Sequence, residues 1–204
     1  MKSIYISGEI GWDVLPKDIT EQLNEAKGED LEINIASPGG YVFDGIEIYN
    51  AIRGYKRKYP DAQIIANMRG IVASMASYIA MNPAIDILTA EDNAVFMIHN
   101  VWGIAVGDYN EMQKTAEIFE GLTNILSDAY VGKTGKDKKE IRKMMDAETW
   151  MFGSEIKEAG FCDEITDSCD EETDKASAII DGKAKFKMLS ERIKENPEKI
   201  KKVA

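Results

Sequence analysis

Two side chains in this sequence have the chemistry of a nucleophile and its base. Ser74 lies in a run of glycine, aliphatic and small residues, N-M-R-G-I-V-A-S-M-A-S at 67–77, and His99, the only histidine, follows the apolar run A-V-F-M-I at 94–98. A serine hydroxyl becomes a strong nucleophile when a base removes its proton, and histidine, with an ordinary pKa of about 6.5, does this at neutral pH. Taken singly, the two residues are more simply a core serine bonded to a carbonyl and a structural histidine.

The positions of these residues strengthen the case for a pair. Each follows a predicted strand, 63–68 before Ser74 and 94–98 before His99. The C-terminal ends of parallel strands gather on one edge of a sheet, where α/β proteins build their sites. The sequence therefore predicts that both side chains lie at the same edge.

Backbone amides near Ser74 would complete such a site. If Ser74 starts a helix, the N–H of Met75 has no intrahelical acceptor and can bind the oxyanion that forms when a carbonyl is attacked. The turn S-P-G-G at 37–40 ends another predicted strand, and Gly39 or Gly40 offers a second amide that no Cβ obstructs. The alternative for S-P-G-G is an ordinary tight turn.

Strand and helix patterns alternate along the chain, which indicates an α/β layered domain with a mostly parallel sheet. The predicted strands are 3–10, 31–36, 63–68, 84–89 and 94–98, and the predicted helices are 18–27, a segment after Gly40 that ends at Gly54, a long helix from Asp108 to Gly132, 137–145 and 154–159. Asp108 and Glu111 have the spacing of a capping box at the start of the long helix. Its apolar stripe is expected to belong to the core and consists of Met112, Ala116, Phe119, Leu122, Leu126 and Ala129.

The composition changes after about residue 166. The stretch D-S-C-D-E-E-T-D-K is acidic and lacks an apolar period, and the remainder has apolar residues at Phe186, Leu189 and Ile193. We expect a domain at 1–166 and a charged C-terminal tail at 167–204 with at most one amphipathic helix.

Charge and cysteine content exclude several classes of function. A net charge of -11 and a pI of about 4.7 disfavour nucleic acid and anionic membranes as partners. No window approaches the roughly 18 apolar residues of a membrane span, and no apolar signal region precedes the first strand, so a cytoplasmic location is expected. Cys162 and Cys169 stand without a histidine or a further cysteine pair nearby, so neither a metal site nor a disulfide framework is predicted.

Several of these stretches, in this order, resemble the ClpP family of Clp-type serine peptidases. They are the S-P-G-G turn, G-I-V-A-S-M-A, F-M-I-H-N and the later T-G, E-T-W-M and A-G-F-C-D, and the resemblance spans residues 3–166. It implies a ClpP/crotonase-like fold with a peptidase domain at 1–166, Ser74 as nucleophile and His99 as general base. The oxyanion hole would be the amides of Met75 and Gly40, with Gly39 as the alternative. The α/β-hydrolases differ, since they carry a G-x-S-x-G motif that is absent here.

The third member of the triad departs from the family pattern. ClpP proteins generally place an aspartate before an R-F pair, whereas M-D-A-E-T-W-M here aligns Glu148 with that aspartate. A glutamate can hold the imidazole in the same way. Asp146 is the alternative acid, and either carboxylate could instead be a solvated surface charge.

A narrower resemblance is to the ClpP-like proteases of phages and prophages that process capsid proteins during head maturation. It is carried by the first strand beginning at Ser3, by E-T-W-M and by the charged tail. It implies a homo-oligomeric ring of seven subunits, single or stacked in two layers, that cleaves capsid or scaffold chains without an ATPase partner. The helix from Asp108 would be the protruding handle helix between rings, and the tail a self-cleaved or scaffold-contacting segment.

Three further functions stay open at this stage. They are a general ClpP-type degradative peptidase, a crotonase-type acyl-CoA enzyme and an inactive ring-forming subunit. A crotonase-type enzyme shares the fold and the oxyanion amides but does not need a serine with a histidine base. The peptidase readings take a protein or peptide substrate and need no cofactor and no metal.

Overall fold

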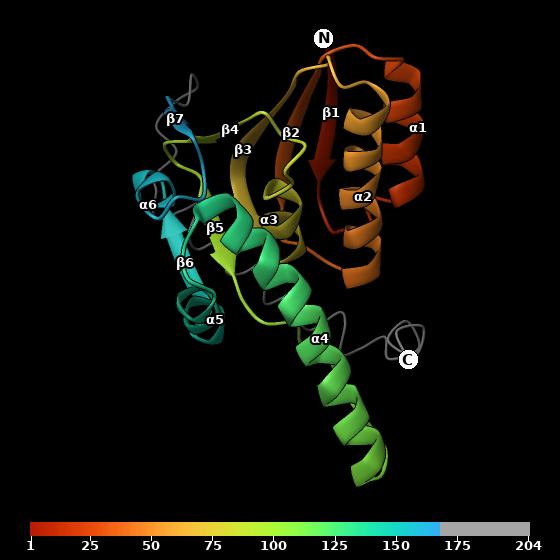
Figure 1. The fold of residues 1–204 in the computed structure, drawn as a ribbon, viewed down its shortest axis with the longest axis vertical. Coiled ribbons are helices and arrows are strands. Elements are labelled where there is room, and N and C mark those ends of the chain that lie inside the picture. Colours follow the sequence, from red (N-terminus) through yellow and green to blue (C-terminus); the bar gives the residue numbers. More distant parts are fainter. Residues whose placement is uncertain (168–204) are drawn as a thin grey trace.

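A sheet of seven strands forms the centre of residues 1–167, the part of the chain that the computed structural model describes (Figure 1). The strands are β1 (Lys2–Ser7), β2 (Leu31–Ser37), β3 (Ile64–Ala73), β4 (Ile87–Glu91), β5 (Val95–Ile98), β6 (Thr149–Phe152) and β7 (Glu164–Thr166). Five of them are neighbours in the order β1-β2-β3-β4-β7, while β5 pairs with β3 and β6 pairs with β5. The pairings are parallel except that of β5 with β6. The predicted α/β fold with a mostly parallel sheet is therefore confirmed.

Helices pack on one face of the sheet along β1 to β3, and others flank β6. Those within residues 1–167 are α1 (Pro16–Ala26), α2 (Val42–Lys58), α3 (Met75–Ala80), α4 (Tyr109–Thr134), α5 (Lys138–Asp146) and α6 (Ser154–Glu158). Figure 1 shows α1 and α2 side by side along β1 to β3, with α3 next to α2. The alternation of side chains explains this choice of face, because Ile4 and Ile6 of β1 are buried whereas Ser3 and Tyr5 between them are exposed.

The other face of the sheet carries polar side chains that satisfy one another. Asn67 of β3 donates to Glu32 and Asn34 of β2 over 3.1 and 3.3 Å, and it accepts a bond of 2.8 Å from Thr89 of β4. Because these groups are hydrogen-bonded across the strands, this face needs no apolar layer above it.

The strand β3 serves two parts of the sheet. Its first half pairs with β4 from Ile65 to Met68, and its second half pairs with β5 from Ile71 to Ala73. Gly70 lies between the halves with φ 77°, a value that favours glycine, and lets the strand change partner. The ends of β3 and β5 consequently lie next to each other.

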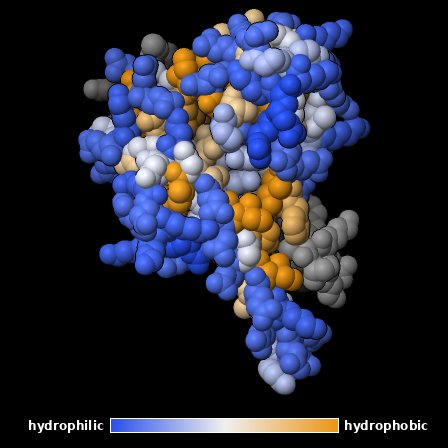
Figure 2. Space-filling view, viewed as in Figure 1, coloured by the Kyte–Doolittle hydropathy of each residue, from blue (hydrophilic) through white to orange (hydrophobic). Residues whose placement is uncertain are grey.

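Half of α4 projects away from the body of the molecule (Figure 1). Its buried residues lie only in the C-terminal half and are Leu122, Thr123, Leu126, Ser127 and Tyr130. Figure 2 shows apolar surface gathered along the middle of the helix. The expectation that the whole stripe from Met112 belongs to the core is wrong, since Met112 is 49% exposed, and the protruding helix implied by the family resemblance is what the structure shows. The capping box of Asp108 and Glu111 is present.

Other boundaries also differ from the predicted ones. The helix α2 continues through Gly54, because Tyr55 is buried beyond it, and α4 ends before Gly135 rather than at Gly132. The first strand ends at Ser7, and the strand expected at 84–89 is β4. The strands β6 and β7 were not predicted, since both are short and neither has an apolar run as long as the A-V-F-M-I that marks β5.

The predicted tail at 167–204 lies, except for Asp167, outside the described residues. No helix within residues 1–167 combines the length and the apolar composition that crossing a bilayer requires.

Candidate active site

Ser74 lies at the strand-to-helix junction between β3 and α3. Its backbone has φ 56° and ψ -124°, a conformation that costs a non-glycine residue about 1–3 kcal/mol. Its N–H donates to the carbonyl of Met97 in β5 over 3.1 Å. This backbone conformation turns the chain sharply at the end of β3, and the bond to Met97 holds the turn. The side chain of Ser74 therefore points outward from the edge of the sheet where the strands end.

His99 reaches Ser74 from the next strand. Ala73 pairs with Met97, so the residues that follow β3 and β5 come out at the same edge of the sheet, as predicted. The Nε2 atom of His99 lies 2.8 Å from the Oγ atom of Ser74. This is hydrogen-bond distance for transfer of a proton from the hydroxyl to the ring.

Burial sets the protonation state of this histidine. Only 9% of His99 is exposed, and desolvation lowers its pKa to about 4, against an opposing effect of the negative charge of Glu148. The ring is therefore neutral at pH 7, with a nitrogen able to accept the proton of Ser74. When Nε2 accepts, the ring proton lies on Nδ1.

The pairing of β5 with β6 places Glu148 beside His99. Ile98 stands opposite Thr149, and the next residue on each strand is His99 on one side and Glu148 on the other. Glu148 has φ 49° at the turn between α5 and β6. One of its oxygens, Oε1, accepts a bond of 3.1 Å from the indole Nε1 of Trp150.

Asp146, the other predicted acid, takes a different partner. It is the last residue of α5, and its Oδ1 accepts a bond of 2.8 Å from the side-chain amide of Asn100. Among the two carboxylates, the one whose charge acts on the pKa of His99 is Glu148.

The predicted amides also meet at Ser74. Met75 is the first residue of α3, so its N–H has no acceptor within the helix. Gly39 packs against this point with φ 95°, and a Cβ added to it would lie 2.6 Å from the Cβ of Ser74 and 2.9 Å from the nitrogen of Met75. The S-P-G-G turn therefore lies directly against the junction between β3 and α3 at Ser74, rather than being an isolated tight turn.

The two glycines of this turn differ in what their N–H groups do. Gly39 donates to the Oγ of Ser37 over 3.1 Å. The bridge to Ile10 uses the carbonyl of Gly39 and the N–H of Tyr41, which leaves the N–H of Gly40 without an acceptor among residues 1–167. This difference favours Gly40 as the second oxyanion donor.

Sequence reasoning missed one residue of this site, Trp150. The spacing of two residues is not a sufficient signal, because Glu148 lies in the turn before β6 with φ 49°, where the alternation of side chains along a strand does not apply. The contact between the two side chains depends on this turn, which the pattern E-T-W alone does not predict.

Within residues 1–167, no group of three or more histidine, cysteine or carboxylate side chains gathers in a way that could hold a metal ion. Cys162 is buried, and desolvation is the main cause that raises its pKa to about 11, so its thiol is protonated at neutral pH. Neither observation links the site around Ser74 to a metal.

A comparison with protein families gives the relationship of the whole domain. The family model described as Clp protease matches residues 1–169 of the 204 residues. The match includes the turn at Gly39 and Gly40 and the residues Ser74, His99 and Glu148. With a strand-to-helix serine, a histidine from the neighbouring strand and a match over most of its length, this chain belongs to the Clp protease family.

Proposed function

We propose that the protein is a serine endopeptidase whose triad is Ser74, His99 and Glu148. Membership of the Clp protease family supports a Clp-type serine peptidase that acts on protein substrates. The single observation that carries the residue assignment is the 2.8 Å contact between the Nε2 of His99 and the Oγ of Ser74.

The reaction follows from these positions. His99 takes the proton of Ser74 through Nε2 while Oγ attacks the carbonyl carbon of the scissile peptide bond. The oxyanion that forms is held by the N–H groups of Met75 and Gly40. His99 then gives the proton to the leaving amine, which departs and leaves an acyl-enzyme. A water molecule, deprotonated by His99, hydrolyses this ester and restores the serine.

Glu148 serves His99 during this cycle. A buried imidazole with a pKa of about 4 resists protonation, and the carboxylate opposes that effect by stabilising the imidazolium. The bond from Trp150 fixes one carboxylate oxygen of Glu148. Asp146 is bonded to Asn100 instead, which favours Glu148 as the acid.

The narrower assignment concerns substrate and assembly. We infer a homo-oligomeric ring, as is usual in the family, with α4 as the contact between rings, because this helix projects and exposes apolar residues such as Ile118 and Ile125. Processing of phage capsid or scaffold chains without an ATPase is supported by the resemblance of E-T-W-M and the charged tail.

A fluorophosphonate probe tests the mechanism, because it reacts only with an activated serine. We expect the probe to label the wild-type protein at Ser74, with no labelling of Ser74→Ala and nearly none of His99→Ala. Removal of a nucleophile or base costs turnover about 10⁶-fold. Labelling that persists in Ser74→Ala would exclude this mechanism, and a wild-type ring that reacts with neither probe nor peptide would favour an inactive subunit.

A digestion assay tests the narrower assignment. We expect the purified wild-type protein to cleave an unfolded protein with no nucleotide present, and Ser74→Ala to leave it intact. Cleavage that appears only with an ATP-driven unfoldase and ATP would favour a general degradative peptidase.

A further inference from the structure

We propose that Ser77 and Tyr130 are positioning residues for the oxyanion hole: they hold the carbonyl of Ser74 and thereby aim the N–H of Met75. The proposal rests on the proposed role of Ser74 as the nucleophile. It assigns a function to a buried pair of hydroxyls that the triad does not use.

The two hydroxyls form a chain that ends on the nucleophile's own backbone. The Oγ of Ser77 donates to the carbonyl oxygen of Ser74 over 2.6 Å, and it lies 2.9 Å from the hydroxyl oxygen of Tyr130. A serine hydroxyl has one proton, which Ser77 gives to Ser74. Tyr130 must therefore be the donor to Ser77, so the chain runs in one direction from α4 to Ser74.

The carbonyl of Ser74 is held twice. Besides the bond from Ser77, it accepts one of 3.2 Å from the N–H of Tyr78, the first turn of α3. These two donors occupy both lone pairs of the oxygen. The carbonyl consequently has one orientation.

A fixed carbonyl fixes the amide on the other side of the same peptide unit. The peptide bond between Ser74 and Met75 is trans and planar, so its C=O and N–H point in opposite directions. Any rotation of this plane would turn the Met75 N–H away from the oxyanion. Ser74 has a backbone conformation that persists only when its surroundings impose it, and the chain from Tyr130 is such a restraint.

Burial makes the restraint effective. Both Ser77 and Tyr130 are 0% exposed, so no water competes for their hydroxyls. The ring of Tyr130 packs edge-on against Phe161, with 6.1 Å between ring centroids. Phenylalanine would keep this packing, so the hydroxyl is the part of Tyr130 that serves Ser77.

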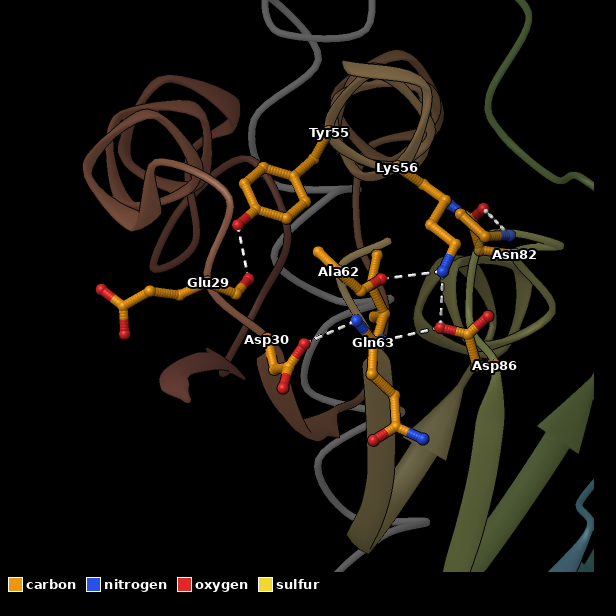
Figure 3. Close-up of polar contacts among 10 residues, drawn as sticks. Glu29, Asp30, Tyr55, Lys56, Ala62, Gln63, Asn82 and Asp86 are labelled. Atoms are coloured by element: carbon orange, nitrogen blue, oxygen red, sulfur yellow. Dashed lines mark hydrogen bonds and ion pairs between the residues drawn. The ribbon is translucent and has the colours of Figure 1, made fainter. Parts of the chain in front are cut away.

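Two substitutions remove the chain while keeping the packing, Tyr130→Phe and Ser77→Ala. Two matched controls remove the same kinds of group outside the chain from Tyr130 to Ser74. Tyr55→Phe removes a phenolic hydroxyl that donates to the carbonyl of Glu29 over 2.6 Å at the opposite edge of the sheet (Figure 3). Ser127→Ala removes the hydroxyl of a serine that is also 0% exposed and donates to a carbonyl three residues earlier, that of Asn124, over 2.8 Å.

The measurements are kcat and KM with a fluorogenic peptide, and the affinity of a peptide boronic acid that forms a tetrahedral adduct on the serine. Loss of one oxyanion donor costs about 10² to 10³ in kcat, so misaiming it should lower kcat by about 10- to 100-fold. We expect Tyr130→Phe and Ser77→Ala to show this loss, with KM within about twofold of wild type and a parallel loss of boronate affinity. Both controls should match wild type.

A double variant tests the direction of the chain. Because Tyr130 acts through Ser77, Ser77→Ala with Tyr130→Phe should be no slower than Ser77→Ala alone. Independent, multiplying losses would overturn the proposal. Neither KM nor the affinity for the boronate depends on the fraction of the enzyme that is folded. Both measurements therefore stay informative if a variant is partly unfolded.

Other outcomes are equally decisive. If the wild type is active and both substitutions match their controls, or if kcat falls while boronate affinity does not, the positioning role is wrong although the triad stands. If the wild type has no Ser74-dependent activity, the proposed function fails and this proposal fails with it.

Discussion

The carboxylates of Glu148 and Asp146 lie two residues apart in the sequence, but they have different partners in the structure. Glu148 acts on His99 and accepts from Trp150, whereas Asp146 accepts from Asn100. We expect Glu148→Gln to lower kcat by at least about 10²-fold, because the neutral amide cannot stabilise the imidazolium. Asp146→Asn should lower it by less than about tenfold. Peptide hydrolysis by both variants checks this, and the reverse ranking would make Asp146 the acid.

The burial of His99 predicts a dependence of stability on pH. Its folded pKa of about 4 lies below the ordinary 6.5, so between these values the unfolded chain binds the proton more tightly. The free energy of unfolding should thus be highest above pH 6.5 and fall as the pH drops towards 4, by about 3 kcal/mol from this group.

Urea unfolding of wild type and His99→Gln at pH 7 and pH 4, at one protein concentration, isolates this contribution. The wild type should lose about 3 kcal/mol more than the variant over that interval. Equal losses would mean that His99 titrates near its ordinary pKa. The wild-type labelling rate should correspondingly hold at pH 5.5, where the ring is still neutral.

At the level of single residues, the sequence predicts the contact of Ser74 with His99 because both follow the ends of parallel strands. It does not predict the chain from Tyr130 to Ser77, whose members lie 53 residues apart on two helices. Which hydroxyls form a hydrogen bond depends on how α4 packs on α3, and no local sequence pattern determines this packing.

At the scale of the helices, strands and turns, two glycines should respond in opposite ways to substitution by alanine. Gly54 lies inside α2 with nothing within 4 Å of an added Cβ, so Gly54→Ala should raise the free energy of unfolding by about 0.5–1 kcal/mol. Gly39→Ala should abolish probe labelling, since its φ is 95° and the new Cβ would meet Ser74. Thermal melts and labelling of both variants check the pair. Full labelling of Gly39→Ala would show that the turn does not pack on Ser74.

The secondary structure could be predicted where the apolar pattern extends over enough residues. Five strands and the long helix with its capping box follow from the apolar pattern, although several ends are displaced. The helix α2 passes Gly54 because tertiary burial of Tyr55 outweighs the low helix propensity of glycine. The prediction that the whole apolar stripe of α4 is buried is wrong, because the same sequence pattern arises whether an apolar helix face packs on the body or projects from it.

At the scale of the whole molecule, the exposed part of α4 predicts that ring assembly depends on the apolar residues of this helix. Ile118 and Ile125 are 43% and 48% exposed and stand seven residues apart, so they share one face of the helix. If this face joins rings, Ile118→Glu with Ile125→Glu should reduce the sedimentation coefficient. Glu120→Gln, an exposed change on the same helix, serves as the control. An unchanged sedimentation coefficient in the double variant would place the contact elsewhere.

The length of α4 gives it leverage over its buried end. At 1.5 Å per residue its 26 residues span about 39 Å, and Tyr130 lies one turn from the inner terminus. The buried part of the helix begins at Leu122, so a force applied to the projecting end acts on the packed segment that contains this tyrosine. The projecting end of α4 and the hydroxyl beside Ser77 thus belong to one continuous helix.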